Sequence, residues 1–395
     1  MAKKLKIGIV VQRYAHDING GAEYHARLIA ELLNNDYEIE VFTSKAIDYI
    51  TWEDHFKDEI EIINNVKVNR FSVRKPRNPK SFGEIQNFIL NEEHSINDEY
   101  LWMEEQGPLL DELLLNLEKR YNEFDLFIFF SYRYYHSFYG IKKFKDKSIL
   151  VPTAEHDDII YLRLFKNFFH LPKAFVYNSL EEKEIINKIS DNKSVPGDIV
   201  GVGSEIPDKF EPESFRKKYN IRNRYFLYIG RLDENKGIPM LFDYYLTLLN
   251  EKKIDMDLVL IGKEKIEIPK HKKIIHLGFL QNKEKFDALK GSEFLIIPSQ
   301  YESLSMVSLE AWAIGKPVVA NGKTEVLKGQ CIRSNAGLWF ENYEEFKEII
   351  LLLDKNKNLL INLGENGIEF FKKNYTWQVI KEKYNNIIKK SLKTS

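Results

Sequence analysis

The chain has 395 residues, of which 44% are hydrophobic and 30% charged, a composition typical of a globular protein of about two domains and not of a fibre or disordered tail. Its 58 Lys and Arg residues balance 59 Asp and Glu residues, which gives no electrostatic basis for bulk nucleic-acid binding. Cys331 is the single cysteine, so an intrachain disulfide is excluded and a cytoplasmic protein is expected.

The first half of the chain alternates β-branched or aromatic runs with amphipathic segments, the pattern of a parallel sheet flanked by helices. A strand from Leu5 to Val11, too short and too soon interrupted for a signal peptide, leads through a glycine pair into apolar residues at helical spacing. Further strands are predicted at 39–43, 66–71, 126–130, 148–151, 174–177 and 198–202, with helices at 109–121 and 180–189. The stretch from Asn78 to Pro108 has no regular pattern. We expect one doubly wound domain over residues 1–203.

A polar stretch from Gly203 to Arg224, which contains two prolines, predicts the connection to a second domain. The alternation then resumes, with strands predicted at 225–229, 257–261, 274–277, 294–297 and 317–320 and helices around Leu241, Phe286, Glu310 and Phe346. These elements predict a second doubly wound domain over 204–376. The last segment, 377–395, is expected to be helical and to cross back onto the first domain.

Two carboxylates, Glu302 and Glu310, flank the start of a helix that follows a buried strand. Free N–H groups and the helix dipole favour an anion at such a start, so the backbone of Ser303, Leu304 and Ser305 could receive a diphosphate. Carboxylates accept hydrogen bonds from vicinal hydroxyls, which suits the two glutamates to the hexose and the ribose of a nucleotide sugar. The alternative is that a serine caps the helix and both glutamates lie on a solvated face.

Arg231 and Lys236 follow the strand at 225–229, at the sheet edge where open α/β folds bind ligands. Their charges suit a departing diphosphate, although solvated surface cations are the alternative. Gly20 and Gly21 follow the first strand and would let backbone N–H groups approach a phosphate. Neither a dinucleotide fingerprint nor a P-loop motif occurs, so no cofactor is expected.

His156 follows the strand at 148–151 and could hydrogen bond a sugar hydroxyl, with a purely structural role as the alternative. The D-x-D pattern of Asp255 and Asp257 precedes its strand, which places it at the amino edge of the sheet and away from the ligand side. No zinc-type cluster occurs, and we expect a metal-independent protein. The basic run from Arg70 to Lys80 could make peripheral contact with the inner face of a membrane, or could be a solvated loop.

Together these segments resemble the retaining glycosyltransferases of family four, a group 1 family with the GT-B fold, over nearly the whole chain. The family's E-x7-E signature, phosphate-binding pair, glycine loop and sugar-contacting histidine are similar, in that order, to Glu302 with Glu310, Arg231 with Lys236, Gly20 with Gly21, and His156. By resemblance, the backbone at Phe279 and Leu280 would bind the base. The chain departs from the family at Ser303-Leu304-Ser305, where glycines usually flank an aromatic residue, and this leaves the donor sugar open.

The resemblance implies an α/β protein with two Rossmann-like domains facing a central cleft, the first on the acceptor side and the second holding the donor. It implies transfer of a sugar, with retention, from a UDP-, GDP- or dTDP-linked donor to a saccharide, lipid-linked glycan or other hydroxyl acceptor in cell-surface polysaccharide or glycoconjugate synthesis. Arg231, Lys236, Glu302 and His156 would act in catalysis. A nucleotide-sugar epimerase of the same fold and a non-catalytic nucleotide-sugar binding subunit remain open, as does the oligomeric state.

Overall fold

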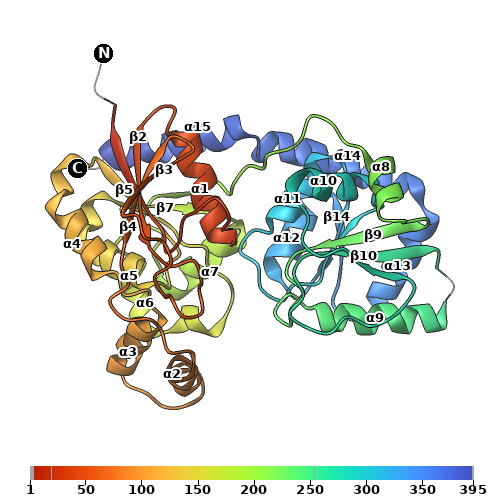
Figure 1. Cartoon of the computed structure of the whole chain (residues 1–395), viewed down its shortest axis with the longest axis horizontal. Helices are drawn as coiled ribbons and strands as arrows, with labels where there is room; N and C mark the ends of the chain where they lie inside the picture. The colour runs from red at the N-terminus through yellow and green to blue at the C-terminus, as the bar shows by residue number, and fades with distance from the viewer. Residues whose placement is uncertain (1–3, 19, 253, 394–395) are drawn as a thin grey trace. The chain divides into compact units, whose positions relative to one another are not determined.

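The computed structural model describes residues 4–18, 20–252 and 254–393. The chain divides into two compact units, the first formed by residues 1–202 and 377–395 and the second by residues 203–376 (Figure 1). Each unit contains one sheet and the helices packed on it. The predicted class, α/β with two doubly wound, Rossmann-like domains, is confirmed.

The first unit has an eight-stranded sheet in the order β3-β4-β2-β1-β5-β6-β7-β8, in which only β3 is antiparallel to its neighbour. Central strands such as β5 are buried at every residue, as expected for parallel strands covered on both faces. The strands are β1 (Lys6–Val10), β2 (Glu38–Ser44), β3 (Ile60–Ile63), β4 (Val66–Phe71), β5 (Leu126–Phe130), β6 (Ser148–Val151), β7 (Ala174–Tyr177) and β8 (Gly197–Ile199).

Helices and short 3-10 turns surround this sheet. The helices are α1 (Gly21–Leu33), α2 (Pro79–Asn91), α3 (Ile96–Gln106), α4 (Asp111–Lys119), α5 (Tyr135–Lys143), α6 (Arg163–Phe168), α7 (Leu180–Ser190) and α15 (Trp377–Lys393). The 3-10 turns are η1 (Tyr121–Glu123), η2 (Lys145–Lys147) and η3 (Asp158–Tyr161).

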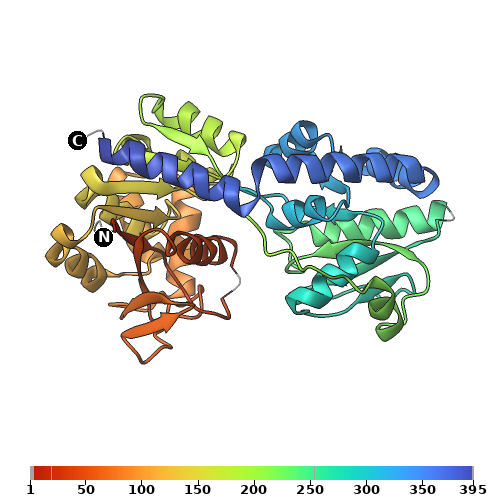
Figure 2. The same ribbon diagram turned by 90° about the horizontal axis from the view of Figure 1, so that it is seen from above.

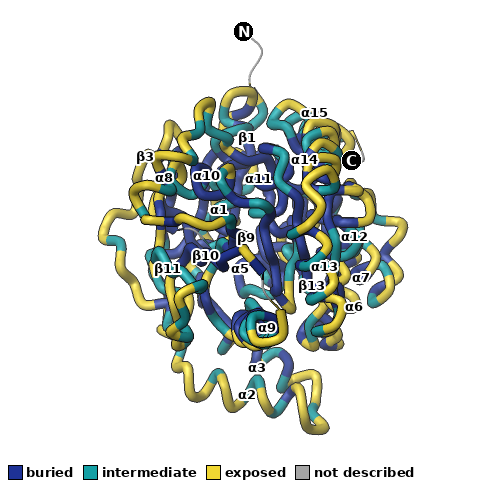
Figure 3. The backbone as a smooth tube through the Cα atoms, turned by 90° about the vertical axis from the view of Figure 1, so that its right-hand side faces the viewer, coloured by how far each residue is buried: buried dark blue, intermediate teal, exposed yellow. Residues whose placement is uncertain are grey.

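The stretch from Asn78 to Pro108, for which no elements were predicted, forms the paired helices α2 and α3. Asn78 begins α2 by accepting the Lys80 N–H at 2.9 Å, and Ser95 begins α3 in a reciprocal capping box with Asp98. Most of α2 is exposed (Figure 3), with Ile89 as its buried residue. The partly buried Phe82, Ile85 and Phe88 pack on the core beside Ile89, so the helix is amphipathic.

Helix α15 completes the first unit by packing against α1, β7 and β8 (Figure 2). Tyr37 donates a hydrogen bond from its hydroxyl to Asn385 Oδ1 at 2.8 Å, and Lys381 forms an ion pair with Asp36 at 2.8 Å. Tyr384 is fully buried on the inner face of the helix. The segment at 377–393 is therefore part of the first unit's core.

The second unit has a six-stranded, fully parallel sheet in the order β11-β10-β9-β12-β13-β14. Its strands are β9 (Arg224–Ile229), β10 (Met256–Ile261), β11 (Ile274–His276), β12 (Leu295–Ile297), β13 (Val318–Asn321) and β14 (Gly337–Phe340). Its helices are α8 (Pro212–Lys218), α9 (Ile238–Glu251), α10 (Asn282–Gly291), α11 (Met306–Ala313), α12 (Glu325–Ser334), α13 (Tyr343–Lys355) and α14 (Lys357–Asn374). The polar stretch from Gly203 to Arg224 is thus not a plain connection, since α8 forms within it.

In the part of the chain described here, no helix has both the length and the apolar character that a membrane span requires.

Candidate functional site

Two polar loops of the second unit meet at the carboxyl ends of the adjacent strands β9 and β12. The backbone N–H of Gln300, after β12, donates to the carbonyl of Asn235, after β9, at 3.3 Å. Gly237 makes their close approach possible, because a Cβ there would lie 2.1 Å from the carbonyl oxygen of Pro298 and its φ of +68° disfavours other residues. The fold therefore fixes these two loops against each other.

The two loops present an ion pair between Lys236 and Glu302, with Nζ 2.6 Å from Oε1 and side chains 24% and 15% exposed. Asp233 connects this pair to Arg231, because it accepts the Lys236 backbone N–H at 3.0 Å and lies 3.3 Å from Arg231 Nε. Burial, and next the nearby Glu302 carboxylate, raise the pKa of the Tyr228 hydroxyl, which donates to the Arg231 carbonyl. The structure thus brings three predicted site residues together.

Glu310 lies on α11, where its side chain is 6% exposed and pairs with Lys285 of α10 at 2.7 Å. Its Oε1 atom takes this contact, whereas the buried Oε2 atom accepts no hydrogen bond from any described residue. A buried acceptor without a donor is costly, on the order of 1–3 kcal/mol. A ligand hydroxyl could therefore donate the hydrogen bond that Glu310 Oε2 lacks.

The first turn of α11 begins at Ser305, which has a left-handed φ of +62° and makes no capping hydrogen bond with its side chain. Its hydroxyl instead accepts from Ser308 Oγ at 2.9 Å, so the alternative that Ser305 caps the helix does not hold. The preceding Leu304 is buried, and its carbonyl accepts from Gln330 Nε2 at 2.7 Å, while Ser303 is half-buried. The Ser308 N–H donates to the Ser305 carbonyl at 3.1 Å, whereas no described hydrogen bond uses the N–H groups of Met306 and Val307.

Phe279 and Leu280 follow β11 and precede α10, the helix that carries Lys285. Phe279 is 53% exposed and Leu280 is buried. The preceding Gly278 carbonyl accepts from the N–H of Gly262, directly after β10, at 2.8 Å. These residues therefore lie at the same carboxyl edge of the sheet as the two polar loops.

Gly20 and Gly21 form the start of α1 in the first unit, above a buried ion pair that the sequence did not indicate. Arg13 donates to Glu23 Oε1 from both Nε and Nη2, at 2.9 and 2.6 Å. A Cβ on Gly20 would lie 2.3 Å from Glu23 Oε2. A side chain at Gly20 would therefore require the Glu23 carboxylate and its ion pair to shift.

His156 is exposed on the loop after β6, with Nε2 2.7 Å from the Tyr161 hydroxyl. The buried carboxylate of Glu182 holds this loop by accepting the Ala154 N–H at 2.6 Å and the Asn178 N–H at 2.5 Å. Burial raises the pKa of Glu182 to about 8, although both hydrogen bonds oppose the shift. His156 belongs to the first unit with the glycine pair, and the other predicted residues belong to the second.

The D-x-D pair lies at the amino end of β10. Asp257 contacts Asn223 at 3.2 Å and Lys273 at 3.4 Å, which fixes it among structural partners. Over residues 4–18, 20–252 and 254–393, no three His, Cys, Asp or Glu side chains gather as a metal site would need. Sequence reasoning missed Lys285, Asp233 and Gln330, and only Asp233, which is adjacent to the cations, carried a local signal.

Residues 211–370 match the family model described as Glycosyl transferases group 1. An uncharacterized glycosyltransferase of Methanocaldococcus jannaschii is 33% identical over 169 residues, which are 38% of this chain and 44% of that protein. The chain therefore spans less than half the length of this curated relative. The residues that match the family model include the loops after β9 and β12.

Solved structures resemble the whole chain. The sucrose-phosphate synthase of Thermosynechococcus elongatus has a TM-score of 0.72 at 14% identity, covering 99% of this chain and 100% of that one. Anabaena HepE in complex with UDP-glucose has a TM-score of 0.70 at 15% identity, with the same coverage. At these identities the similarity establishes the fold, and it confirms the predicted GT-B class.

Proposed function

We propose that the protein is a glycosyltransferase that moves a sugar from a nucleoside diphosphate sugar to a hydroxyl acceptor. The observation that carries this proposal is the pairing of Lys236 with Glu302 beside Arg231, at the carboxyl edge of the second sheet. A donor diphosphate would compete with Glu302 for the Lys236 ammonium. The exchange would free the Glu302 carboxylate to accept hydroxyls of the donor sugar.

Glu310 is proposed to bind the ribose of the donor. One carboxylate oxygen is held by Lys285, and the buried Oε2 atom has no described donor, so a ribose hydroxyl would remove an unfavourable feature of the site. The backbone N–H groups at the start of α11 would bind the diphosphate, and the backbone at the exposed Phe279 and the buried Leu280 would contact the base. The similarity to a protein solved with UDP-glucose makes UDP sugars the first donors to test.

Arg231 and Lys236 would stabilise the negative charge that grows on the departing diphosphate, and we propose that this makes a metal ion unnecessary. Transfer would retain the anomeric configuration: the acceptor hydroxyl would attack from the face that the diphosphate leaves, the bond between the sugar and the diphosphate would break, and the leaving phosphate would take the hydroxyl's proton. His156 would hydrogen bond the donor sugar, and positioning would supply much of the acceleration. The acceptor is proposed to be a saccharide or lipid-linked glycan, with synthesis of surface polysaccharide on the cytoplasmic side of the membrane.

A donor panel tests the proposal. Thermal shifts with UDP-, GDP- and dTDP-linked sugars should show preferential stabilisation by one base and sugar, and Glu302→Ala should reduce that shift. Lys270→Ala removes an exposed lysine of the same unit that makes no described ion pair, and should leave the shift unchanged. Product analysis without acceptor tests the alternatives, since an epimerised donor indicates an epimerase and hydrolysis of the donor argues against a non-catalytic binding subunit. The proposal fails if no donor stabilises the protein.

A further inference from the structure

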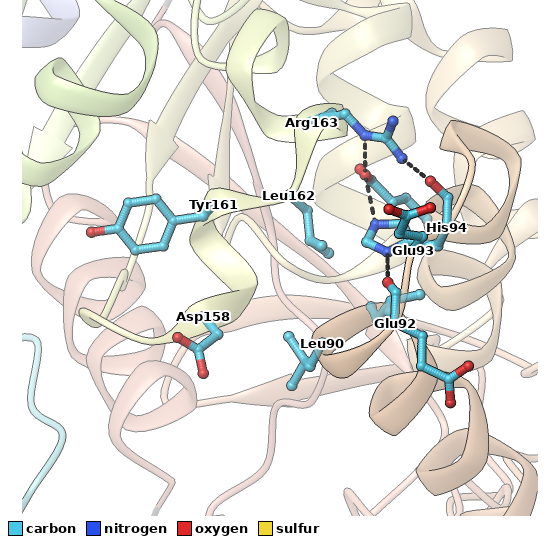
Figure 4. A pocket seen from close by; sticks show the side chains of 10 residues that line it. Leu90, Glu92, Glu93, His94, Asp158, Tyr161, Leu162 and Arg163 are labelled. Atoms are coloured by element: carbon cyan, nitrogen blue, oxygen red, sulfur yellow. Dashed lines mark hydrogen bonds and ion pairs between the residues drawn. The ribbon is translucent and has the colours of Figure 1, made fainter.

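A cavity of about 640 Å³ lies entirely within the first unit, between the end of α2, the start of α3 and η3 (Figure 4). Ile89, Leu90 and Leu162 give it apolar surface, and the other lining residues are polar. The polar lining residues are Glu92, Glu93, His94, Glu99, Asp158, Tyr161 and Arg163. Apolar surface beside a few hydrogen-bonding groups is the pattern of a small-molecule site.

Glu99 organises one wall of this cavity. Its carboxylate is fully buried and accepts from Arg163 Nε at 2.7 Å and from the Leu164 N–H at 2.9 Å, with His94 Nε2 at 3.2 Å. Arg163 also donates from Nη2 to the His94 carbonyl at 2.7 Å. These bonds fix Arg163 in place and leave its Nη1 group, which makes no described hydrogen bond, to donate to a ligand.

The charge of the cavity is negative. Glu99 compensates the Arg163 guanidinium, whereas Glu92, Glu93 and Asp158 form no ion pair with any residue in the described part of the chain. Three uncompensated carboxylates repel a phosphate or a carboxylate ligand and accept hydrogen bonds from hydroxyl or ammonium groups. The chemistry therefore selects a ligand that is rich in hydroxyls and carries no negative charge.

The cavity is connected to the candidate sugar-contacting histidine through Tyr161, which lines the cavity and whose hydroxyl lies 2.7 Å from His156 Nε2. Tyr161 is 47% exposed and offers an aromatic face, on which the apolar face of a sugar ring can pack. We infer that this cavity binds a neutral or amine-bearing sugar unit of the acceptor, and that it excludes anionic sugars. This inference rests on the proposed function for its link to transfer.

Saturation-transfer NMR on the full chain tests the inference with methyl α-glucoside, glucosamine and glucuronate as probes. The first two should bind and glucuronate should not. Asp158→Lys should weaken glucosamine binding about tenfold or more and bring glucuronate into the cavity. Glu84→Lys makes the same charge change on an exposed part of α2 outside the cavity and should leave all three probes as in the wild type.

Equal binding of glucuronate by the wild type would overturn the inference, as would equal effects of the two variants or no binding of any probe. Melting temperatures of both variants establish that they fold. UDP binding to the same wild-type sample separates the two proposals. A protein that binds UDP and none of the sugars refutes the cavity alone, whereas one that binds sugars and none of the nucleotides of the donor panel refutes the proposed function alone.

Discussion

Lys236 and Glu302 are 66 positions apart in the sequence, yet their charged atoms lie 2.6 Å apart at the meeting point of two loops. Each side chain is partly buried and holds the other in position. The pair keeps a cation and a carboxylate ready at the place where a phosphate and a sugar hydroxyl would need them. It is therefore the first target for mutagenesis.

Replacing Lys236 with alanine should lower the transfer rate constant about 100- to 1,000-fold, because the leaving diphosphate loses a fixed positive charge. The stability cost should stay near 1 kcal/mol, since the ion pair is not fully buried. Initial rates and thermal melts measure the two effects separately. Lys270→Ala is the matched control, and a Lys236→Ala rate within threefold of wild type contradicts the assignment.

Glu310→Gln should weaken UDP binding about tenfold, because the amide is a poorer acceptor for the ribose and leaves Lys285 without its ion-pair partner. The same change should also lower the melting temperature. Adding Lys285→Met should restore the melting temperature and leave UDP binding weak. Calorimetric titration distinguishes these effects, and recovery of wild-type affinity in the double variant would assign Glu310 a structural role only.

Gly237→Ala should destabilise the second unit more than Gly278→Ala. Both glycines have φ near +70°, so both variants carry backbone strain of about 1–2 kcal/mol. Only at Gly237 does the new methyl group collide with backbone, whereas an added Cβ at Gly278 meets no atom within 4 Å. Urea unfolding should therefore give a lower midpoint for Gly237→Ala, and equal midpoints would show that the loops separate at no cost.

The buried His25 should make the first unit sensitive to acid. Burial lowers the pKa of this imidazole from 6.5 to about 3, opposed by a hydrogen bond with the Gly201 backbone. Below pH 6.5 the unfolded chain binds a proton that the folded chain excludes, so the free energy of unfolding falls as the pH falls. Between pH 6.5 and 5 the loss should approach about 2 kcal/mol.

Unfolding by urea at several pH values measures this loss. His25→Gln should flatten the slope of stability against pH over that range, whatever its effect on stability itself. His55→Gln, at an exposed position of the same unit, should keep the wild-type slope. Identical slopes for all three proteins would mean that His25 takes up its proton in the folded state.

The buried strands were predictable because a short run of apolar residues indicates a strand that is covered on both faces of the sheet. The predicted limits of β4, β5, β6 and β7 coincide with those in the structure. β5, β6 and β7 are short, fully buried runs made almost entirely of aliphatic or aromatic residues, whereas β4 also contains Lys67, Asn69 and Arg70. The short edge strand β3, which exposes Ile60 and Ile62, was not predicted. Helix α2 was also missed, although Phe82, Ile85, Phe88 and Ile89 recur at helical spacing. The caps at Asn78 and Ser95 were further signals for α2 and α3.

The residues of the candidate site could be proposed from the sequence by their type and position, whereas their contacts could not. The position of Arg231 and Lys236 after a strand follows from the α/β pattern, because ligand loops lie at the carboxyl edge. The partner of Glu310 does not follow, since Lys285 lies 25 positions away on another helix. The buried ion pair of Arg13 and Glu23 was missed for a related reason, since the glycine pair predicted a phosphate-binding backbone and does not indicate which side chains pack beside Gly20.

The return of α15 to the first unit has a consequence for how the protein is made. When residues 4–202 have left the ribosome, α15 does not yet cover β7, β8 and the surface around His25. Residues 203–376 must be synthesised before α15 is made. The second unit, continuous in sequence, can reach its native state while the first waits. A chain without residues 377–393 should therefore resemble the incompletely synthesised protein. In that chain, residues 4–202 should need protection from aggregation and residues 203–376 should not.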